Sequence, residues 1–302
     1  MIIRFVSATS RAVTVLAPAK VNVWLCIRGR RSDGYHEIDT LLLPTSLADR
    51  LTVRRGAADR LVLTIRGGAR GLMPDGRNTV VRAARALQAA DGRAPGAVLA
   101  LSKRTPIGAG LGGGSSDAAA AFVALARLWR SGVSMRRLRR MAGAIGSDVP
   151  FFLGDGAARA RGRGERLAPV ECPRPFHLVL VYPEFESSTR EVYGALRRFR
   201  PWARRRPVSP CGALRALREG DPVALAKHLH NDLEAPAQAL SPRLKSLRHA
   251  LEQLPFLGVG MSGSGSCYFG ICRDAAQSRS LARQVVRLQL GRAWAVTAGG
   301  RP

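Results

Sequence analysis

Lysine is scarce in this 302-residue chain, because all but four of its 48 basic residues are arginine. Acidic residues are also few, 21 in all, and the formal net charge is +27. Such a charge can mark a protein that binds nucleic acid or an acidic substrate. Arginine replaces lysine along the whole chain, which indicates a general preference for arginine rather than a binding patch. We therefore do not expect nucleic acid as the partner, although the basic segment 197–207, "RRFRPWARRRP", could contact a polyanion.

Clustered cysteines and long apolar runs are absent as well. The five cysteines show no C-x-x-C spacing, which argues against a disulfide framework or a zinc site and indicates reduced thiols in the cytoplasm. No stretch approaches the roughly 18 consecutive apolar residues of a membrane span. The first 32 residues lack an acid, as in a transit peptide, but a strand-like pattern already begins near Val13. His228 and His230 would point to different faces of a predicted helix, which argues against a metal site there.

The first half of the chain has a β-rich opening followed by helices. Alternating apolar residues predict two strands, broken at Ala17–Pro18, and a further strand over 61–65. Asn78 is the expected N-cap of a helix that ends at Gly92. Beyond it we expect a strand over 97–103, helices over 115–129 and 135–144, and a hairpin within 154–167.

Three prolines within 168–175 predict the domain boundary, with domains 1–172 and 173–302. The second half then reads as a strand over 176–183, four helices, a pair of strands within 258–272, a fifth helix and a last strand. The helices are predicted over 188–199, 211–219, 222–233, 242–254 and 275–289, and the last strand over 293–297. This order indicates an α+β fold.

The segment "RTPIGAGLGGGSSDAAAAF" (104–122) places five glycines and two serines between Gly108 and Ser116. It satisfies G-x-G-x-x-G, but no acid follows at the distance at which a dinucleotide site holds a ribose hydroxyl. A P-loop needs a lysine after the glycines, and a protein-kinase glycine loop leads into a strand rather than a helix. A glycine-rich turn without a ligand is one alternative, but glycine loses much conformational freedom on folding, so five in nine residues need a reason. The favoured explanation is a phosphate-binding loop at a helix N-terminus, with serine hydroxyls as donors or magnesium ligands.

Phosphate transfer without a P-loop lysine needs a cation and a base from elsewhere in the chain. Lys20 is a candidate for the cation, because a compact ammonium fits beside a carboxylate where a guanidinium does not. Asp148, in "GSDVPFF", is a candidate for the base, although an aspartate in a turn before proline is common for structural reasons alone.

Three segments together resemble the GHMP kinase superfamily, which is named for galacto-, homoserine, mevalonate and phosphomevalonate kinases. They are "PAKVN" (18–22), "PIGAGLGGGSSDAA" (106–119) and "GMSGSGSCYFG" (260–270). The resemblance implies a two-domain α+β fold, with an N-terminal domain like ribosomal protein S5 and a ferredoxin-like C-terminal domain. It also implies an ATP-dependent kinase for a small molecule.

Within the superfamily, "GRRSDGYHEI" (29–38), "NTVVRAA" (78–84) and "GSDVPFF" (146–152) resemble members that phosphorylate the C2 hydroxyl of a cytidylyl sugar alcohol for isoprenoid synthesis by the non-mevalonate route. A mevalonate or homoserine kinase would not need Tyr35 and His36. The alternatives are nevertheless such a kinase or, from another class, a basic RNA-binding protein.

The resemblance assigns Lys20 and Asp148 to catalysis, and ATP and Mg²⁺ as cofactors. The implied ATP-binding residues are Asn78, Pro106, Ile107, Gly108, Ala109, Gly110, Leu111, Gly112, Gly113, Gly114, Ser115 and Ser116. The implied substrate-binding residues are Asn22, Tyr35, His36, Thr189, Ser262, Gly263, Ser264 and Gly265. Ser115 or Ser116 could hold Mg²⁺, and the chain could be a monomer or a homodimer.

Overall fold

A computed structural model describes residues 1–302 except 58–59, 68–71, 93–94, 201–202, 204–207 and 301–302. The strands are β1 (Arg4–Ala8), β2 (Ala12–Arg30), β3 (His36–Arg55), β4 (Leu61–Gly67), β5 (Ala97–Lys103), β6 (Ala158–Gly162), β7 (Arg166–Pro169), β8 (Pro175–Tyr182), β9 (His230–Asn231), β10 (Gly258–Met261), β11 (Tyr268–Cys272) and β12 (Arg292–Gly299). The helices are α1 (Thr79–Asp91), α2 (Gly113–Trp129), α3 (Met135–Ile145), α4 (Val149–Phe152), α5 (Thr189–Phe199), α6 (Cys211–Glu219), α7 (Pro222–Lys227), α8 (Glu234–Leu240), α9 (Pro242–Glu252) and α10 (Ala275–Arg287).

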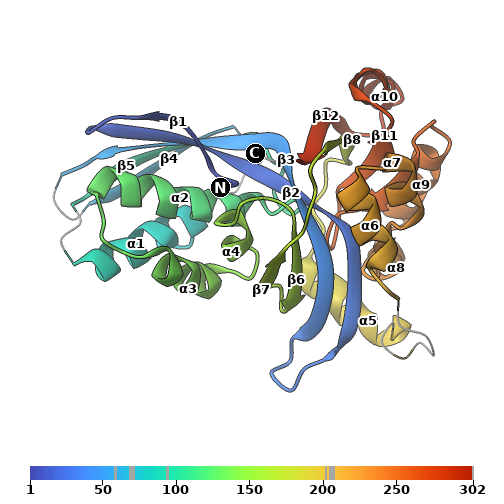
Figure 1. Cartoon of the computed structure of the whole chain (residues 1–302), viewed down its shortest axis with the longest axis horizontal. Helices are drawn as coiled ribbons and strands as arrows, with labels where there is room; N and C mark the ends of the chain where they lie inside the picture. Colours follow the sequence, from blue (N-terminus) through green and yellow to red (C-terminus); the bar gives the residue numbers. More distant parts are fainter. Residues whose placement is uncertain (58–59, 68–71, 93–94, 201–202, 204–207, 301–302) are drawn as a thin grey trace.

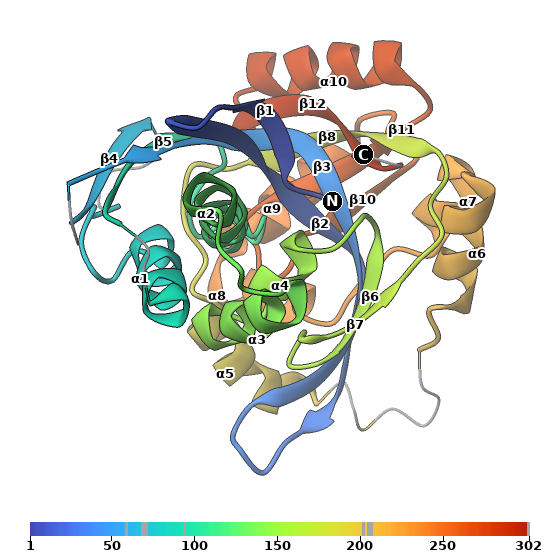
Figure 2. The ribbon, with the colours of Figure 1, turned by 60° about the vertical axis from the view of Figure 1, so that its left-hand side comes forward.

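The long strand β3 connects the two halves of the molecule. Residues 50–55 of β3 pair with β5, and residues 38–42 pair with β6. Thr45, between these two segments, pairs with Ala298 of β12. From β12 the strand order continues through β8 and β11 to β10. Helices α1 to α4 pack under the N-terminal strands, whereas α5 to α10 surround the C-terminal strands (Figures 1 and 2).

The predicted break at Ala17–Pro18 is wrong, because β2 is one strand of 19 residues. Pro18 pairs with Ala48, but Lys20 already pairs with Pro44, so the register shifts between these two positions. A proline is tolerated in a strand where the ladder is irregular, because its missing N–H then costs no regular hydrogen bond. The shift frees the backbone N–H of Lys20 for a partner outside the sheet.

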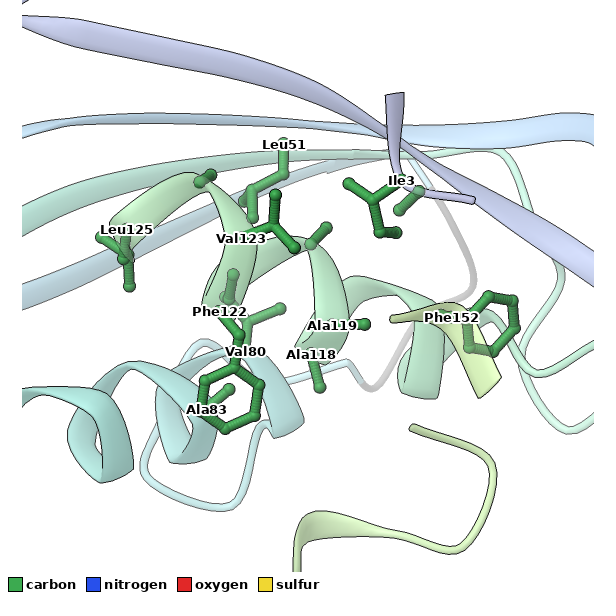
Figure 3. Packing of buried hydrophobic residues seen from close by; sticks show 14 of the residues in the cluster. Ile3, Leu51, Val80, Ala83, Ala118, Ala119, Phe122, Val123, Leu125 and Phe152 are labelled. Atoms are coloured by element: carbon green, nitrogen blue, oxygen red, sulfur yellow. The ribbon is translucent and has the colours of Figure 1, made fainter. Parts of the chain in front are cut away.

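Helix α2 is buried between the sheet and α1 because its sequence is apolar on all sides. Phe122 points toward Val80 and Ala83 of α1, while Val123 lies on the side of Leu51 of β3 (Figure 3). The alanines at 118–121 are fully buried, which lets the helix lie close to both neighbours. The glycine segment that precedes α2 is therefore fixed to a rigid element.

In the second half of the chain, the structure differs from the prediction in one region. The predicted helix 222–233 is wrong beyond Lys227: His228 caps α7, and His230 and Asn231 form β9 beside β2. The side chain of Asn231 accepts the N–H of Leu233, and such local bonds compete with a helix. The helix α8, which follows, was not predicted.

Several local predictions are confirmed. Asn78 caps α1, Gly92 ends it in the left-handed conformation, and Ser134 caps α3. The basic segment 197–207 begins in the last turn of α5, but 201–202 and 204–207 lie outside the described residues. The boundary at 172/173 stays a prediction. Among the residues that the structure describes, no helix combines the length and apolar character that crossing a membrane requires.

Candidate active site

The register shift in β2 places Lys20 against the glycine loop. Its freed N–H donates to the carbonyl oxygen of Leu111 at 2.9 Å. Its side chain is buried, donates to Oδ1 of Asn22 and lies 3.8 Å from Oδ2 of Asp148. Burial lowers the pKa of the Lys20 ammonium, against the opposing attraction of the Asp148 carboxylate. The ammonium is thus shielded from solvent, and Asp148 is the carboxylate close to it among the described residues.

The loop itself follows a path that glycine favours. Gly108, Gly110 and Gly112 have φ values of 61°, 74° and 68°, which lie in the left-handed region. Helix α2 begins at Gly113, two residues before the predicted start, so the last glycines form its first turn. Residues 113–115 of this turn line one cavity, and because the first N–H groups of a helix have no partner within it, the turn suits an anion site.

The C-terminal Gly/Ser segment closes on this loop from the other half of the molecule. The Ser262 hydroxyl donates to the carbonyl oxygen of Gly110 at 3.0 Å and accepts the Asn22 N–H at 3.2 Å. A Cβ on Gly110 would lie 2.0 Å from the carbonyl oxygen of Ser262. The two segments therefore approach as closely as backbone atoms allow.

This approach gives a prediction for Gly110→Ala. A side chain there combines a left-handed backbone with a clash against Ser262, so the free energy of unfolding should fall by about 2 kcal/mol or more. Urea denaturation measures the change. The control is Gly114→Ala, whose Cβ would meet Thr79 Oγ1 at 3.7 Å, an ordinary contact. If both variants unfold alike, the close approach does not limit this position.

A buried ionic cluster under the loop was missed by the sequence analysis. Lys103 donates to Oδ2 of Asp49 and, at 2.7 Å, to Oδ2 of Asp117. The other oxygen of Asp49 accepts the N–H groups of Arg104 and Thr105 at 2.6 and 2.8 Å, which fixes the chain between β5 and the loop. Burial raises the pKa of Asp117 to about 7. Burial acts to lower the pKa of Lys103, but the two carboxylates outweigh it and raise that pKa.

The loop, Lys20 and Asp148 line one cavity of about 1130 Å³. Most residues implied for ATP or substrate also line it, namely Asn22, Tyr35, His36, Asn78, the loop from Pro106 to Ser115, Thr189, Gly263 and Ser264. Ser116, Ser262 and Gly265 are not among the lining residues. Ser116 and Ser262 are fully buried, and Ser262 contacts the loop through its hydrogen bond to Gly110. Thr189 and Ser264 share a hydrogen bond of 2.8 Å, which joins α5 to the third segment.

Aromatic side chains also line this cavity. Tyr193 of α5, which the sequence analysis did not select, lies 5.3 Å from His36 between ring centroids. The guanidinium of Arg163 lies over the ring of Tyr35 at 4.8 Å, and Tyr35 is 54% exposed. Burial, and then the charge of Arg30, lower the pKa of His36, which favours a neutral ring with one donor and one acceptor. Burial raises the pKa of Tyr193, and the charge of Asp148 adds to this.

Two arginines on α5 line the cavity as well. Arg190 and Arg197 are seven residues apart, about two helical turns, and both line the cavity with Tyr193 and Gly194 between them. Arg198, next in sequence, is exposed and is not among the lining residues. One face of α5 thus presents two cations and an aromatic ring.

The geometry suits phosphoryl transfer to a hydroxyl group. The loop offers backbone N–H groups for phosphates, and the cavity also holds a carboxylate and an ammonium, the groups that such a transfer uses for proton removal and charge stabilisation. The flat rings and arginines that line the same cavity suit a planar, anionic group. Tyr193 could have been found from its place at i+4 after Thr189, and Lys103 from being one of the few lysines.

Comparison with known families agrees with this geometry. Residues 78–156 match the GHMP kinases N terminal domain, and residues 213–289 match the GHMP kinases C terminal domain. The first match contains the loop and Asp148, and the second contains the Gly/Ser segment that closes on the loop.

Similar proteins cover nearly the whole chain. The 4-diphosphocytidyl-2-C-methyl-D-erythritol kinase of Pelotomaculum thermopropionicum is 42% identical over 276 residues, 91% of this chain and 94% of its own. The Mycolicibacterium smegmatis kinase of the same name is 40% identical over 282 residues, 92% of this chain and 87% of its own. A crystal structure of 4-(cytidine 5'-diphospho)-2C-methyl-D-erythritol kinase matches with a TM-score of 0.80 and 42% identity, over 95% of this chain and 99% of that one. A homoserine kinase from Cytophaga hutchinsonii matches over 98% of this chain and 96% of its own, with a TM-score of 0.73 at 18% identity, which shows a shared fold alone.

Proposed function

The chain belongs to the GHMP kinases, with their two-domain α+β fold, and we propose that it phosphorylates the C2 hydroxyl of 4-diphosphocytidyl-2-C-methyl-D-erythritol with ATP. The proposal rests above all on one observation. A single cavity is lined by the glycine loop, Lys20 and Asp148 together with aromatic rings and arginines. The identity of about 40% with kinases of that name favours this substrate over mevalonate or homoserine.

Asp148 is the base in the proposed mechanism. Its side chain is 37% exposed toward the cavity and can accept the proton of the substrate hydroxyl as the oxygen attacks the γ-phosphorus. Lys20 orients that hydroxyl, while its buried charge stabilises the negative charge on the transferring group. The glycine loop holds the ATP phosphates through backbone N–H groups, and no covalent enzyme intermediate is required.

The residues around the loop fit a magnesium ion that is held mainly by phosphates. Ser115 lines the cavity, whereas Ser116 is fully buried and its Oγ has no partner among the described residues. Of the two, we assign Ser115 as the magnesium ligand, since Mg²⁺ commonly takes few protein ligands beside water and phosphate oxygens. The ion, when bound, neutralises charge on the β- and γ-phosphates.

In this proposal, the aromatic and arginine side chains of the cavity bind the cytosine and the diphosphate of the substrate. Tyr35 and Tyr193 provide faces for a flat base, and the neutral His36 ring can pair with its polar edge. Arg190 and Arg197 face the diphosphate, whose charge-assisted hydrogen bonds with guanidinium groups are strong. Asn22 and Thr189 line the same cavity and would contact the sugar alcohol.

This arrangement predicts a selective defect in Arg190→Ala/Arg197→Ala. Losing two charge-assisted contacts should raise KM for the cytidylyl substrate at least about tenfold and leave KM for ATP unchanged. Arg198→Ala, on the same helical turn but outside the cavity, should behave as wild type. Steady-state kinetics with each substrate varied in turn measures both constants. An equal rise in both KM values would contradict the assignment.

The substrate is tested by ADP release from ATP with purified protein and one acceptor at a time. We expect turnover with 4-diphosphocytidyl-2-C-methyl-D-erythritol and none with mevalonate or homoserine. Turnover with mevalonate or homoserine alone would refute the substrate. No turnover with any acceptor, together with RNA binding at physiological salt, would refute the kinase and favour the RNA-binding alternative.

We place the protein in the cytoplasm, as its cysteine usage suggests. None of its five cysteines, all within the described residues, forms a disulfide, and four of them are buried.

A further inference from the structure

Three side chains of the kinds that bind zinc lie close together where β9 runs beside β2. Cys26 lies on β2, His230 on β9 and Asp232 just after it, and one ligand atom from each lies within 4.8 Å of the others. Cys26 and Asp232 are buried, while the His230 side chain is 25% exposed. The sequence argument against a metal here assumed one helix through His228 and His230. That premise is wrong, because the helix ends before His230.

The fold orients these groups by bonds independent of any ion. β9 runs parallel to β2, with His230 beside Trp24, and the Asp232 N–H donates to Leu25 at 3.0 Å. Oδ2 of Asp232 accepts the Ile27 N–H at 2.7 Å, which holds the carboxylate in place. Its Oδ1 lies 2.9 Å from Nε2 of His230, which fixes the direction of the imidazole. The bond from Ile27 is of the kind that preorganises a metal ligand, whereas a bound cation would replace the hydrogen bond between His230 and Asp232.

We propose that Cys26, His230 and Asp232 form a binding site for a zinc-type divalent cation. A thiolate, an imidazole and a carboxylate are the ligands that zinc takes in proteins, at about 2.0–2.3 Å. Ligand atoms around a tetrahedral zinc lie roughly 3.3–3.8 Å apart, so binding requires the Cys26 sulfur to rotate closer and the hydrogen bond between His230 and Asp232 to open slightly. The Cys26 thiol loses its proton on binding, and thiolate plus carboxylate neutralise the 2+ charge. The fourth ligand is water.

A second cavity, of about 440 Å³, reaches His230, although Cys26 and Asp232 are not among its lining residues. It is lined by Asn22, His230, Asn231 and Glu234, among others, and so offers polar groups to a bound water. A cation here ties β9, from the C-terminal half, to β2, which carries Lys20 and Asn22. Its role is structural, since no group of the phosphate-binding loop lies in this set.

Cobalt binding tests the site with the full-length protein after chelator treatment. Co²⁺ bound to a thiolate gives a charge-transfer band in the near ultraviolet, and we expect it to saturate at one equivalent and to be displaced by Zn²⁺. Cys26→Ser should abolish the band, and His230→Gln should weaken Co²⁺ binding at least about tenfold. Unchanged circular dichroism of each variant checks that it folds.

Matched controls are available in the chain. Cys211→Ser removes an exposed thiol and His228→Gln an exposed imidazole two residues from His230, and both should bind Co²⁺ as wild type does. The site is refuted if wild type shows no band, if Cys26→Ser retains it, or if Cys211→Ser loses it. Stronger thermal stabilisation of wild type than of Cys26→Ser by one equivalent of Zn²⁺ would support a structural role.

Discussion

Asp148→Asn should lower kcat by at least about a hundredfold and leave the Kd for ATP within about twofold of wild type. The amide keeps the size of the side chain but cannot take a proton from the attacking hydroxyl. It also removes the carboxylate 3.8 Å from the Lys20 ammonium, so the pKa of Lys20 should fall further. Single-turnover kinetics reports the chemical step, and equilibrium titration reports ATP binding.

The matched control for this variant is Asp155→Asn. Asp155 is an exposed aspartate seven residues along the chain, its side chain 86% accessible, and it does not line the catalytic cavity. Its kcat should equal that of wild type. If Asp148→Asn retains more than about a tenth of the wild-type kcat, another group removes the proton and the proposed base is wrong.

Lys103→Met should have the largest effect on stability. The substitution leaves Asp49 and Asp117 buried without their cation, and removing one partner of a buried ion pair costs about 3–5 kcal/mol. Urea unfolding at neutral pH measures the loss, with the exposed Lys245→Met as control. A loss below about 1 kcal/mol would show that this cluster does not hold the loop.

The loss of stability in Lys103→Met should also depend on pH, and the direction of this dependence follows from the pKa of Asp117. Burial raises the pKa of this carboxyl in the folded state to about 7, far above its ordinary value. The folded protein therefore binds more protons than the unfolded chain between these two values, and stability falls as pH rises through that window. Without Lys103, the charged form of the buried Asp117 carboxyl destabilises the fold more than in wild type. The difference in free energy of unfolding between Lys103→Met and wild type should therefore narrow as pH falls from about 8 to about 5.

Local chemistry explains which elements could be predicted from the sequence. Asn78 and Ser134 were recognised because a side-chain cap acts within three residues, and the strand 97–103 because its alternation is regular. The break at Pro18 was wrong because its effect depends on β3, whose register shift accommodates the proline. The helix 222–233 was wrong because Asn231 and Asp232 bond to backbone groups that local periodicity cannot reveal.

The same distinction holds for the site. The glycine loop, Lys20 and Asp148 were selected by residue type, and the structure places them in one cavity. Asp49 could not be paired with Lys103 from sequence, because 54 residues separate them.

The burial of two of the four lysines has a consequence for chemical labelling. Lys20 and Lys103 are 4% and 6% exposed, whereas Lys227 on α7 and Lys245 on α9 are accessible and lie outside the catalytic cavity. Amine-reactive dyes, cross-linkers and acetylating reagents should therefore modify few side chains, none of them in the active site. A protein with so little reactive amine can be attached to a surface through Lys227 or Lys245 while its catalytic cavity stays open.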